Sequence, residues 1–268
     1  MPLFQLFLVA VLQGLTEFLP VSSSGHLILL PKLTGMNDQG LAIDVAVHVG
    51  TLFAVVLYFW SDVRLALGGT WRLLHGKVDT QGAWLALCLA IATVPVIVVG
   101  ITLKLLNLDD VLRNVTVIGW TMLLLGLLLY WADQKFTSDR RAEKWGLRDA
   151  VILGLWQAVA LIPGTSRSGI TITGARMLGF DREGAARLSM LMSIPTILAS
   201  GLVLGLDVIG QADLQLAKDA GVAAVFAFGA ALLALTLMMR LLRSVSFTPY
   251  VIYRVILGVG LLVIGYSS

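Results

Sequence analysis

The feature that most constrains this chain is a series of apolar segments, each close to the length of a membrane span. A transmembrane helix needs about 20 consecutive and mostly apolar residues. Six segments meet or approach this length: 41–60, 83–104, 112–132, 186–206, 218–240 and 249–266. The chain is 58% hydrophobic and only 13% charged, which excludes a soluble enzyme with a water-solvated surface. The sequence therefore predicts an all-α polytopic membrane protein with six transmembrane helices.

Two further apolar segments, 2–33 and 148–179, contain breaks that an ordinary span does not have. The first is interrupted at Pro20–His26 and the second at Pro163–Gly169, mainly by proline, glycine and hydroxyl residues. Each break separates two helices that are too short to cross a bilayer. Non-helical backbone at membrane depth persists only where it is buried in protein or lines a wet cavity. This pattern is typical of a re-entrant helix–loop–helix hairpin.

The same order of elements occurs twice along the chain. Residues 1–132 hold one broken hairpin followed by three spans, and residues 148–268 hold another. Aligning the two breaks at their prolines places Ser23 on Ser166. Because three spans is an odd number, the second copy enters the membrane upside down relative to the first. We therefore predict an inverted-topology repeat within one membrane domain, with its site near the midplane where the hairpins meet.

Basic residues are unevenly distributed between the two sides that this topology defines. One side carries the basic residues found within 64–77, 135–148, 176–187 and 240–254. The other side carries Lys32, Lys104, Arg113 and Lys218. Because basic residues favour the cytoplasm, we expect the first hairpin to enter from outside and the second from inside. Cytoplasmic loops account for the net charge of +3, and no nucleic-acid partner is expected.

Each break lies beside polar side chains that are unfavourable to bury. Gln13 and Glu17 are four residues apart, so they share a helix face just before the first break. The first break adds Ser22, Ser23, Ser24 and His26, and the second adds Thr165, Ser166, Arg167, Ser168 and Thr171. Ionisable residues at membrane depth are candidates for function, because burying them unpaired costs several kcal/mol.

Together these groups suit phosphoryl transfer. Arginine presents a planar fork of donors that matches phosphate oxygens, and the free N–H groups of the helix after the second break suit an anion. A hydroxyl can donate to a phosphate or attack it, and a histidine can move the proton. A carboxylate can hold a divalent cation that shields phosphate charge. Positioning and charge neutralisation provide most of the catalysis in such reactions.

At these residues the chain resembles the undecaprenyl pyrophosphate phosphatase family of the BacA (UppP) type. Gln13–Glu17 matches that family's (E/Q)xxxE motif, and Pro163–Thr171 matches its PGxSRSxxT motif. Val21–His26 is similar to the family's segment between them, and the resemblance covers essentially the whole chain. Many members have glutamate where this chain has Gln13, whose side chain can coordinate a cation but cannot act as a base.

The resemblance implies an enzyme that hydrolyses undecaprenyl pyrophosphate to undecaprenyl phosphate and inorganic phosphate. This reaction recycles the lipid carrier for peptidoglycan and other envelope polymers, and overproduction gives bacitracin resistance. The resemblance also implies a bacterial inner-membrane protein whose site opens to the periplasm, with magnesium or calcium as the cofactor. The expected partners are the polyprenyl pyrophosphate substrate and membrane lipids, and a homodimer stays open.

The resemblance assigns roles to individual residues. It implies a catalytic set of Glu17, Ser23, His26 and Arg167. The expected substrate-binding residues are Gln13, Ser22, Ser24, Gly164, Thr165, Ser166, Ser168 and Thr171. Glu17, together with Gln13, is expected to hold the cation. The attacking group is left open between Ser23, His26 and a water molecule.

Three other interpretations compete with this one. An inverted repeat with broken helices is also transporter architecture, so the chain could flip a phosphorylated polyprenyl lipid instead of cleaving it. A phosphatase of the type-2 phosphatidic acid class would need a histidine after Arg167, and the sequence has none there. A purely structural scaffold would not require a buried acid and a buried arginine beside hydroxyls. Asp44 and His48, four residues apart in the first span, are interpreted as a structural pair.

Overall fold

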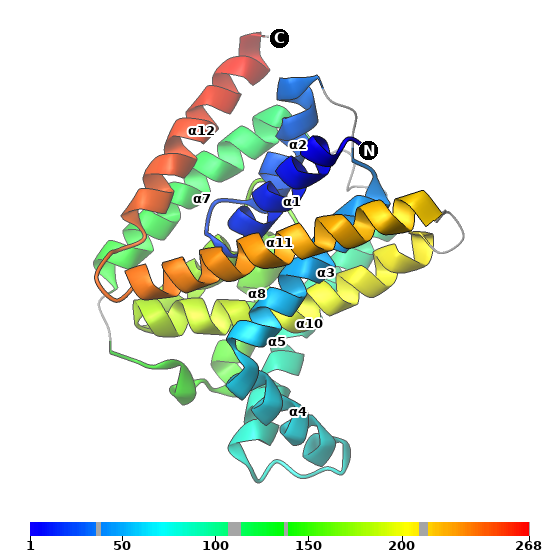
Figure 1. The fold of residues 1–268 in the computed structure, drawn as a ribbon. Helices are drawn as coiled ribbons and strands as arrows, with labels where there is room; N and C mark the ends of the chain where they lie inside the picture. The colour runs from blue at the N-terminus through cyan, green and yellow to red at the C-terminus, as the bar shows by residue number, and fades with distance from the viewer. Residues whose placement is uncertain (36–38, 107–113, 137–138, 209–213, 268) are drawn as a thin grey trace.

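The computed structural model describes residues 1–35, 39–106, 114–136, 139–208 and 214–267, without the side chains of Ser24, 31–33 and 206–208. These residues are helical, with no strand among them. The elements are α1 (Leu3–Phe18), α2 (Ser23–Thr34), α3 (Leu41–Tyr58), α4 (Trp60–Leu74), α5 (Gln81–Leu105), α7 (Val115–Lys135), the 3-10 helix η1 (Ala142–Lys144), α8 (Leu147–Val159), α9 (Arg167–Met177), α10 (Arg182–Val208), α11 (Leu214–Leu241) and α12 (Thr248–Ser267). Figure 1 shows how they are arranged.

Six of these helices are long and apolar enough to cross a membrane: α3, α5, α7, α10, α11 and α12. They coincide with the six predicted spans to within a few residues at each end. Many of their large apolar side chains are exposed, as expected for helices whose outer faces contact lipid. The chain is therefore a multi-pass membrane protein.

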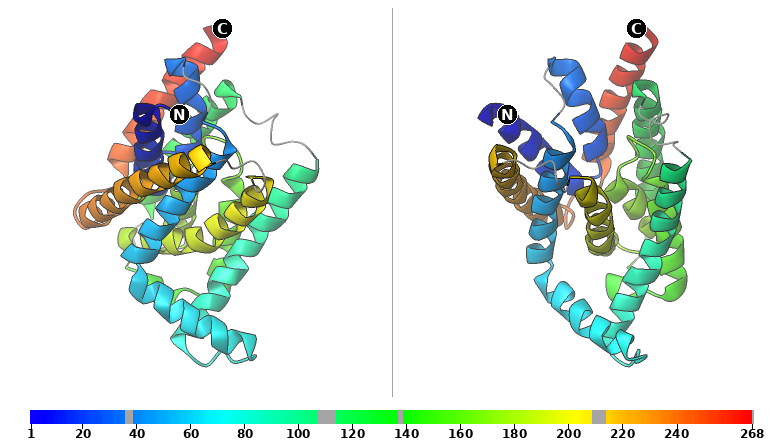
Figure 2. Two further views of the ribbon diagram at one scale, coloured as in Figure 1. Left: turned by 45° about the vertical axis from the view of Figure 1, so that its right-hand side comes forward. Right: turned by 90° about the vertical axis from the view of Figure 1, so that its right-hand side faces the viewer.

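Helix α4 is the main element that the sequence did not predict. The chain turns at Phe59, directly after the first span, and continues as a second helix that carries Asp62, Arg64 and Arg72. In the sequence, these charges indicate a loop outside the membrane-spanning segments. In the structure, α4 packs on α5, and the two project together from one end of the molecule (Figure 2). Their contact is so close that a Cβ at Gly69 would lie 2.0 Å from the carbonyl oxygen of Gly82.

The two breaks have closely similar turns. Ser22 and Ser166 both adopt a positive φ, of 74° and 68°, a conformation that is uncommon outside glycine. The hydroxyl of Ser22 accepts from the N–H of Gly25 at 3.3 Å, and that of Ser166 accepts from the N–H of Gly169 at 3.1 Å. Ser22 is thus the structural equivalent of Ser166. The alignment at the prolines, which placed Ser23 on Ser166, is wrong by one residue, because the loop before the second turn is longer.

The first helix of each broken pair packs against the other half of the chain. Helix α1 lies along α11, and α8 lies along α5, while α7 packs on α12 (Figure 1). Gly14 makes the first of these contacts possible, because a Cβ at this position would lie 2.6 Å from the carbonyl oxygen of Ala227. The small buried residues Ala223, Ala227 and Ala231 of α11 face this contact. Because each of these helices packs against the other half of the chain, the end of α1 lies next to the start of α9.

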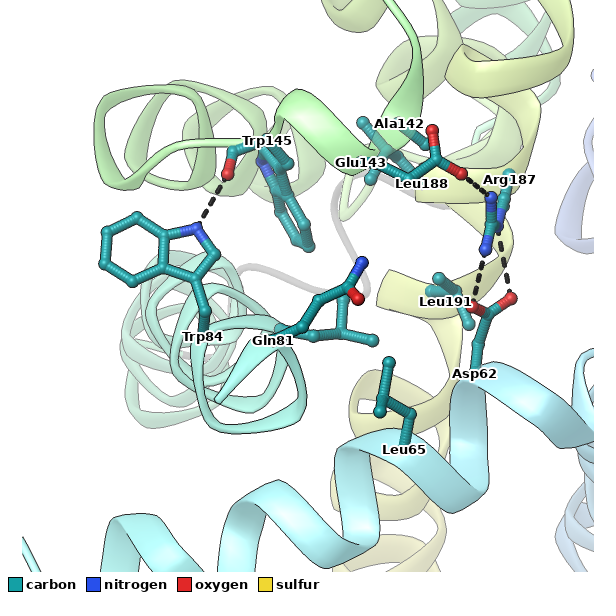
Figure 3. Close-up of a pocket in the computed structure, with 11 residues that line it drawn as sticks. Asp62, Leu65, Gln81, Trp84, Ala142, Glu143, Trp145, Arg187, Leu188 and Leu191 are labelled. Atoms are coloured by element: carbon teal, nitrogen blue, oxygen red, sulfur yellow. Dashed lines mark hydrogen bonds and ion pairs between the residues drawn. The ribbon is translucent and has the colours of Figure 1, made fainter. Parts of the chain in front are cut away.

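Ion pairs connect the helix ends near the segment that joins the two halves. Arg187 at the start of α10 pairs with Asp62 of α4 at 2.6 Å and also with Glu143 of η1, beside a small pocket (Figure 3). A hydrogen bond from its own backbone, together with Arg187, holds the pKa of Glu143 below its ordinary value. Asp133 of α7 pairs with Arg176 at 3.2 Å and with Arg182 at 2.8 Å. These pairs tie together α4, α7, η1, α9 and α10.

We expect Asp133→Ala to destabilise the fold, because it leaves Arg176 without its carboxylate partner. Asp133 is 1% exposed and Arg176 is 4% exposed, so the orphaned charge is not solvated. Removing one partner of a buried pair costs about 3–5 kcal/mol. The measurement is thermal unfolding in detergent. The control is Glu183→Ala, whose pair with Arg243 is exposed and 3.8 Å long. Equal melting temperatures for the two variants would contradict the prediction.

Candidate active site

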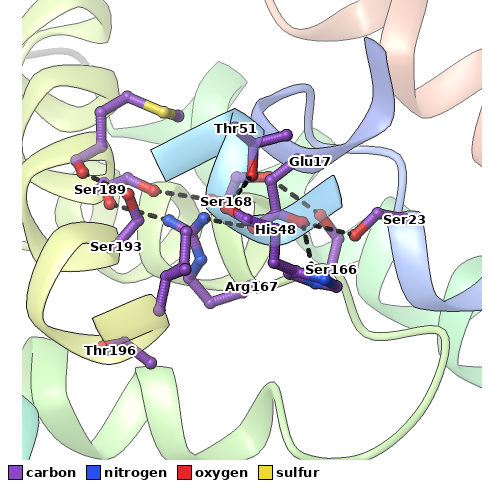
Figure 4. A network of polar contacts seen from close by, with 12 residues as sticks. Glu17, Ser23, His48, Thr51, Ser166, Arg167, Ser168, Ser189, Ser193 and Thr196 are labelled. Carbon is purple, nitrogen blue, oxygen red and sulfur yellow. Dashed lines mark hydrogen bonds and ion pairs between the residues drawn. The ribbon is translucent and has the colours of Figure 1, made fainter. Parts of the chain in front are cut away.

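The tips of the two broken helix pairs meet at Glu17 and Arg167. Arg167 Nη2 at the start of α9 donates to Glu17 Oε1 near the end of α1, at 2.9 Å (Figure 4). The two side chains are only 14% and 8% exposed. An acid and a guanidinium from opposite halves of the chain therefore share one buried pocket, as the sequence predicted for these two residues.

The second carboxylate oxygen of Glu17 is also held. Glu17 Oε2 accepts from Gln13 Nε2 at 2.9 Å and from the hydroxyl of Ser23 at 2.8 Å. His48 Nε2 lies 3.9 Å from the same oxygen. Gln13 and Glu17 share a helix face, as predicted from their spacing. These contacts fix the orientation of the carboxylate and place a serine hydroxyl directly on it.

Arg167 is also positioned by α10 and by the aromatic ring at the end of α1. Its Nη1 donates to the carbonyl oxygen of Ser189 on α10 at 3.0 Å, and its guanidinium lies 6.0 Å from the centre of the Phe18 ring. Thr171, one turn further along α9, exchanges a 2.6 Å hydrogen bond with the hydroxyl of Ser189. The guanidinium is thus held in one plane while its fork reaches the pocket.

The second break is also connected to the first. The hydroxyl of Ser168 donates to the carbonyl oxygen of Leu19 at 2.9 Å, and it contacts the hydroxyl of Ser166 at 3.1 Å. Gly164 has a φ of 84°, and a Cβ there would lie 2.3 Å from Thr121 Oγ1. This glycine therefore serves the backbone of the turn. Thr165 Oγ1 is buried and has no hydrogen-bond partner within the described part of the chain.

Arg254 is a buried arginine, although we counted it among the basic residues of the cytoplasmic side. It is 0% exposed, inside α12, and its Nη2 donates to the carbonyl oxygens of Gly164 at 3.3 Å and Thr165 at 2.9 Å. Its Nε donates to the carbonyl oxygen of Met122. Arg254 thus holds the loop before Arg167 from behind. The signal available in the sequence was its position within the predicted span 249–266.

His26 is held by groups other than Glu17. Its Nδ1 lies 2.6 Å from the carbonyl oxygen of Ser22, so this nitrogen carries the proton. Its Nε2 therefore accepts from the hydroxyl of Tyr253 on α12, and the two rings are stacked with their planes 8° apart. The sequence did not indicate Tyr253. The catalytic role expected of His26 stays a prediction.

His48 is the histidine that lies against Glu17, although the sequence was interpreted as giving it a structural partner in Asp44. Its Nδ1 donates to the backbone carbonyl of Asp44 at 2.7 Å, and the Asp44 carboxylate accepts instead from Gln39 at 2.8 Å. Nε2 of His48 is directed toward Glu17, and the side chain is 37% exposed. The residue therefore lies at the opening of the pocket.

Comparison with known proteins decides the family. The family model described as "Bacitracin resistance protein BacA" matches residues 6–260. The chain belongs to the BacA family. It is 72% identical to the undecaprenyl-diphosphatase of Dinoroseobacter shibae and 69% identical to that of Roseobacter denitrificans, in each case over 100% of both chains. It is 66% identical to the undecaprenyl-diphosphatase of a Jannaschia species, again over the full length of both.

The structure of this BacA-family chain groups most of the predicted residues into one site. Glu17, Gln13, Ser23, Arg167 and Thr171 belong to a single network of contacts, which Ser166 and Ser168 border. Ser22 forms the first turn, and the side chain of Ser24 lies outside the described residues. Over the residues that the structure covers, no three histidine, cysteine or acidic side chains gather as a metal-binding group.

Proposed function

We propose that this chain hydrolyses undecaprenyl pyrophosphate to undecaprenyl phosphate and inorganic phosphate. The observation that carries the proposal is the contact between Glu17 and Arg167, with the Ser23 hydroxyl 2.8 Å from the same carboxylate. The relatives named undecaprenyl-diphosphatase support the choice of substrate, and the family's printed description supports a link to bacitracin resistance. The product would return to the synthesis of cell-envelope polymers.

In the proposed mechanism, Arg167 binds the pyrophosphate through the guanidinium fork that faces the pocket. The hydroxyl of Ser23, or a water molecule that it orients, attacks the terminal phosphorus. Glu17 is the group placed to accept the proton, because it already accepts the Ser23 hydrogen bond. The bond from the terminal phosphorus to the bridging oxygen breaks, and undecaprenyl phosphate leaves. If Ser23 attacks, water then hydrolyses the seryl phosphate.

The assignment of proton transfer to Glu17 differs from the expectation for His26. In the structure, both ring nitrogens of His26 are engaged by Ser22 and Tyr253. His48, at 3.9 Å from Glu17 and partly exposed, offers the nearer route for a proton to solvent. We therefore propose His48 as the proton relay and His26 as a residue that supports the first turn.

The residues around Glu17 fit a divalent cation that the substrate helps to bind. Gln13 Oε1 is buried, lies on the residue beside the Glu17 carboxylate, and has no hydrogen-bond partner among the described residues. Magnesium is commonly held by one or two carboxylates together with substrate phosphates and water. Glu17 and Gln13 would hold the ion, which would neutralise charge on the phosphates.

The test is release of inorganic phosphate by the purified protein from undecaprenyl pyrophosphate, with and without a chelator. We expect the wild type to release phosphate and the chelator to abolish release. Gln13→Leu removes the orphaned oxygen and is expected to raise the magnesium concentration for half activation by about tenfold, whereas Gln13→Glu lowers it. Lipid flipping without phosphate release would reject the proposal in favour of a transporter. Full activity in chelator would remove the cation.

We also propose that α1–α2 and α8–α9 are re-entrant hairpins that enter the membrane from opposite sides. The N-terminal amino group pairs with Asp219 near the start of α11 at 2.6 Å. Phe180, just after α9, instead bridges to Arg140 in the joining segment. The outer ends of the two pairs therefore lie at different ends of the spans. With basic loops in the cytoplasm, this arrangement supports a bacterial inner-membrane protein whose site opens to the periplasm.

Cysteine labelling of intact cells tests this orientation. We expect Ser267→Cys to react with a membrane-impermeant maleimide added outside, because α12 would end in the periplasm. Lys77→Cys, in the loop between α4 and α5, is expected to react only after the membrane is permeabilised. The single native cysteine, Cys88, is buried and supplies a low background. The reverse labelling pattern would show that the protein has the opposite orientation.

A further inference from the structure

An apolar groove opens beside the site, between the second halves of α5 and α10. Its volume is about 320 Å³, within the range of ligand-binding pockets. Gly100 of α5, Leu161 just after α8, and Ala199 and Val203 of α10 line it, and Lys104 lies at one end. Across the part of the chain that the structure covers, no acidic side chain lines this groove.

Two prolines mark the beginning of the groove. Pro95 lies inside α5 and Pro195 inside α10, and the groove lining starts at the next residue of each helix, Val96 and Thr196. A proline inside a helix removes one backbone hydrogen bond and bends the helix. The sequence thus provides a local reason for the two helices to separate here.

One face of α10 leads from the Glu17–Arg167 site to the groove. The carbonyl oxygen of Ser189 accepts from Arg167. Ser193 comes four residues after Ser189, and Thr196 comes three residues after Ser193, so all three lie on the same side of the helix (Figure 4). Thr196 also lines the groove. The hydroxyls of Ser193 and Thr196 donate to carbonyl oxygens of their own helix. The contact with Arg167 and the beginning of the groove are therefore about two helical turns apart on α10.

We propose that this groove binds the isoprenoid units of the substrate that follow its first unit. The inference rests on the proposed function and names the tail-binding part of the same site. A pyrophosphate on Arg167 requires its apolar tail to leave the pocket along an apolar path, and the groove supplies apolar lining about two turns further along α10. Lys104 at the far end marks the level where its ammonium group can reach water. The groove thus lies between the level of the reacting phosphate and the level of Lys104. This part of the membrane is apolar, as a prenyl chain requires.

Gly100→Leu tests the proposal by filling the groove. A Cβ at Gly100 would meet only the Leu161 side chain, at 3.8 Å, so the helix tolerates a larger residue. No atom of the Glu17–Arg167 site lies within 4 Å of that Cβ. Ala199→Leu fills the groove from α10 and provides a second, independent variant. Gly229→Leu on the exposed side of α11, where nothing lies within 4 Å, is the matched control.

The measurement is kcat/KM for two substrates, undecaprenyl pyrophosphate and dimethylallyl pyrophosphate, which has a single isoprene unit. Both groove variants are expected to lower kcat/KM for the long substrate by about tenfold or more, because one misplaced methylene in an apolar pocket has this effect. Values for the short substrate are expected to stay within about twofold, and Gly229→Leu is expected to behave as the wild type. These expectations correspond to about 1.4 kcal/mol of lost binding for the long substrate.

Each other outcome decides against the inference. If the variants leave both substrates unaffected, the groove holds ordinary membrane lipid and the tail binds elsewhere. If they lower both values equally, with an unchanged melting temperature, the groove supports the pocket and does not select the tail. A wild-type protein that releases no phosphate from either substrate overturns the proposed function itself, which keeps the two failures distinguishable.

Discussion

Arg167→Ala is expected to lower the turnover of undecaprenyl pyrophosphate by at least about 100-fold. Arg167 is the cation that faces the pocket from the second half of the chain, and it donates to Glu17 from a largely buried position. Loss of a preorganised group that stabilises transition-state charge typically lowers kcat by about 10²–10³. The measurement is the rate at which the purified protein releases inorganic phosphate when undecaprenyl pyrophosphate is the substrate.

Two further variants define what Arg167 supplies. Arg167→Lys keeps the charge but loses the planar fork that contacts Glu17 and Ser189 together. We expect it to recover only a small part of the lost rate. Arg243→Ala is the control, because this arginine is 72% exposed and belongs to no part of the site. Near-normal turnover by Arg167→Ala would remove the guanidinium from the mechanism.

Glu17→Gln is expected to lower turnover by about two orders of magnitude as well. The amide keeps the size of the side chain, so α1 and its contacts with α11 are preserved. It cannot accept a proton from Ser23, and it no longer neutralises Arg167. The Ser23 hydroxyl would lose the charged acceptor that orients it. Phosphate release and the melting temperature are measured together.

The comparison with Glu17→Ala separates chemistry from folding. Glu17→Ala leaves a buried arginine without a partner, so we expect a lower melting temperature in addition to the loss of activity. Glu17→Gln keeps an amide oxygen that can accept from Arg167, so its melting temperature is expected to fall less than that of Glu17→Ala. If Glu17→Gln retained more than about a tenth of the wild-type rate, Glu17 would not be the proton acceptor. The binding role of Arg167 would remain separately testable.

Much of the architecture follows from the sequence because its signals are local. The six spans are set by length and composition. The predicted breaks overlap the interruptions at 19–22 and 160–166, although α2 already begins at Ser23 and α9 at Arg167. The meeting of Glu17 with Arg167 required one more step, the inverted repeat. The contact itself is present in the structure, while the inverted repeat from which it was inferred stays a prediction.

The contacts that were missed all depend on which helices pack together. His48 reaches Glu17 because α3 lies beside α1, and Tyr253 reaches His26 because α12 lies beside the first break. Arg254 was counted as a loop charge because it lies near one end of a span. Neither spacing nor composition identifies the neighbour of a helix face. Helix α4 was missed for a related reason, since its charges mask an apolar side that packs on α5.

The pairing of α1 with α11 has a consequence for biosynthesis. Helix α1 is translated well before α11, yet the alanine-lined surface on which it rests belongs to α11. Until α11 has been inserted, Gly14 and the acid beyond it have no protein surface to settle on. The pocket therefore reaches its final form only after α11 has been inserted. A nascent chain arrested before α11 should be easily digested by proteases at its amino-terminal end.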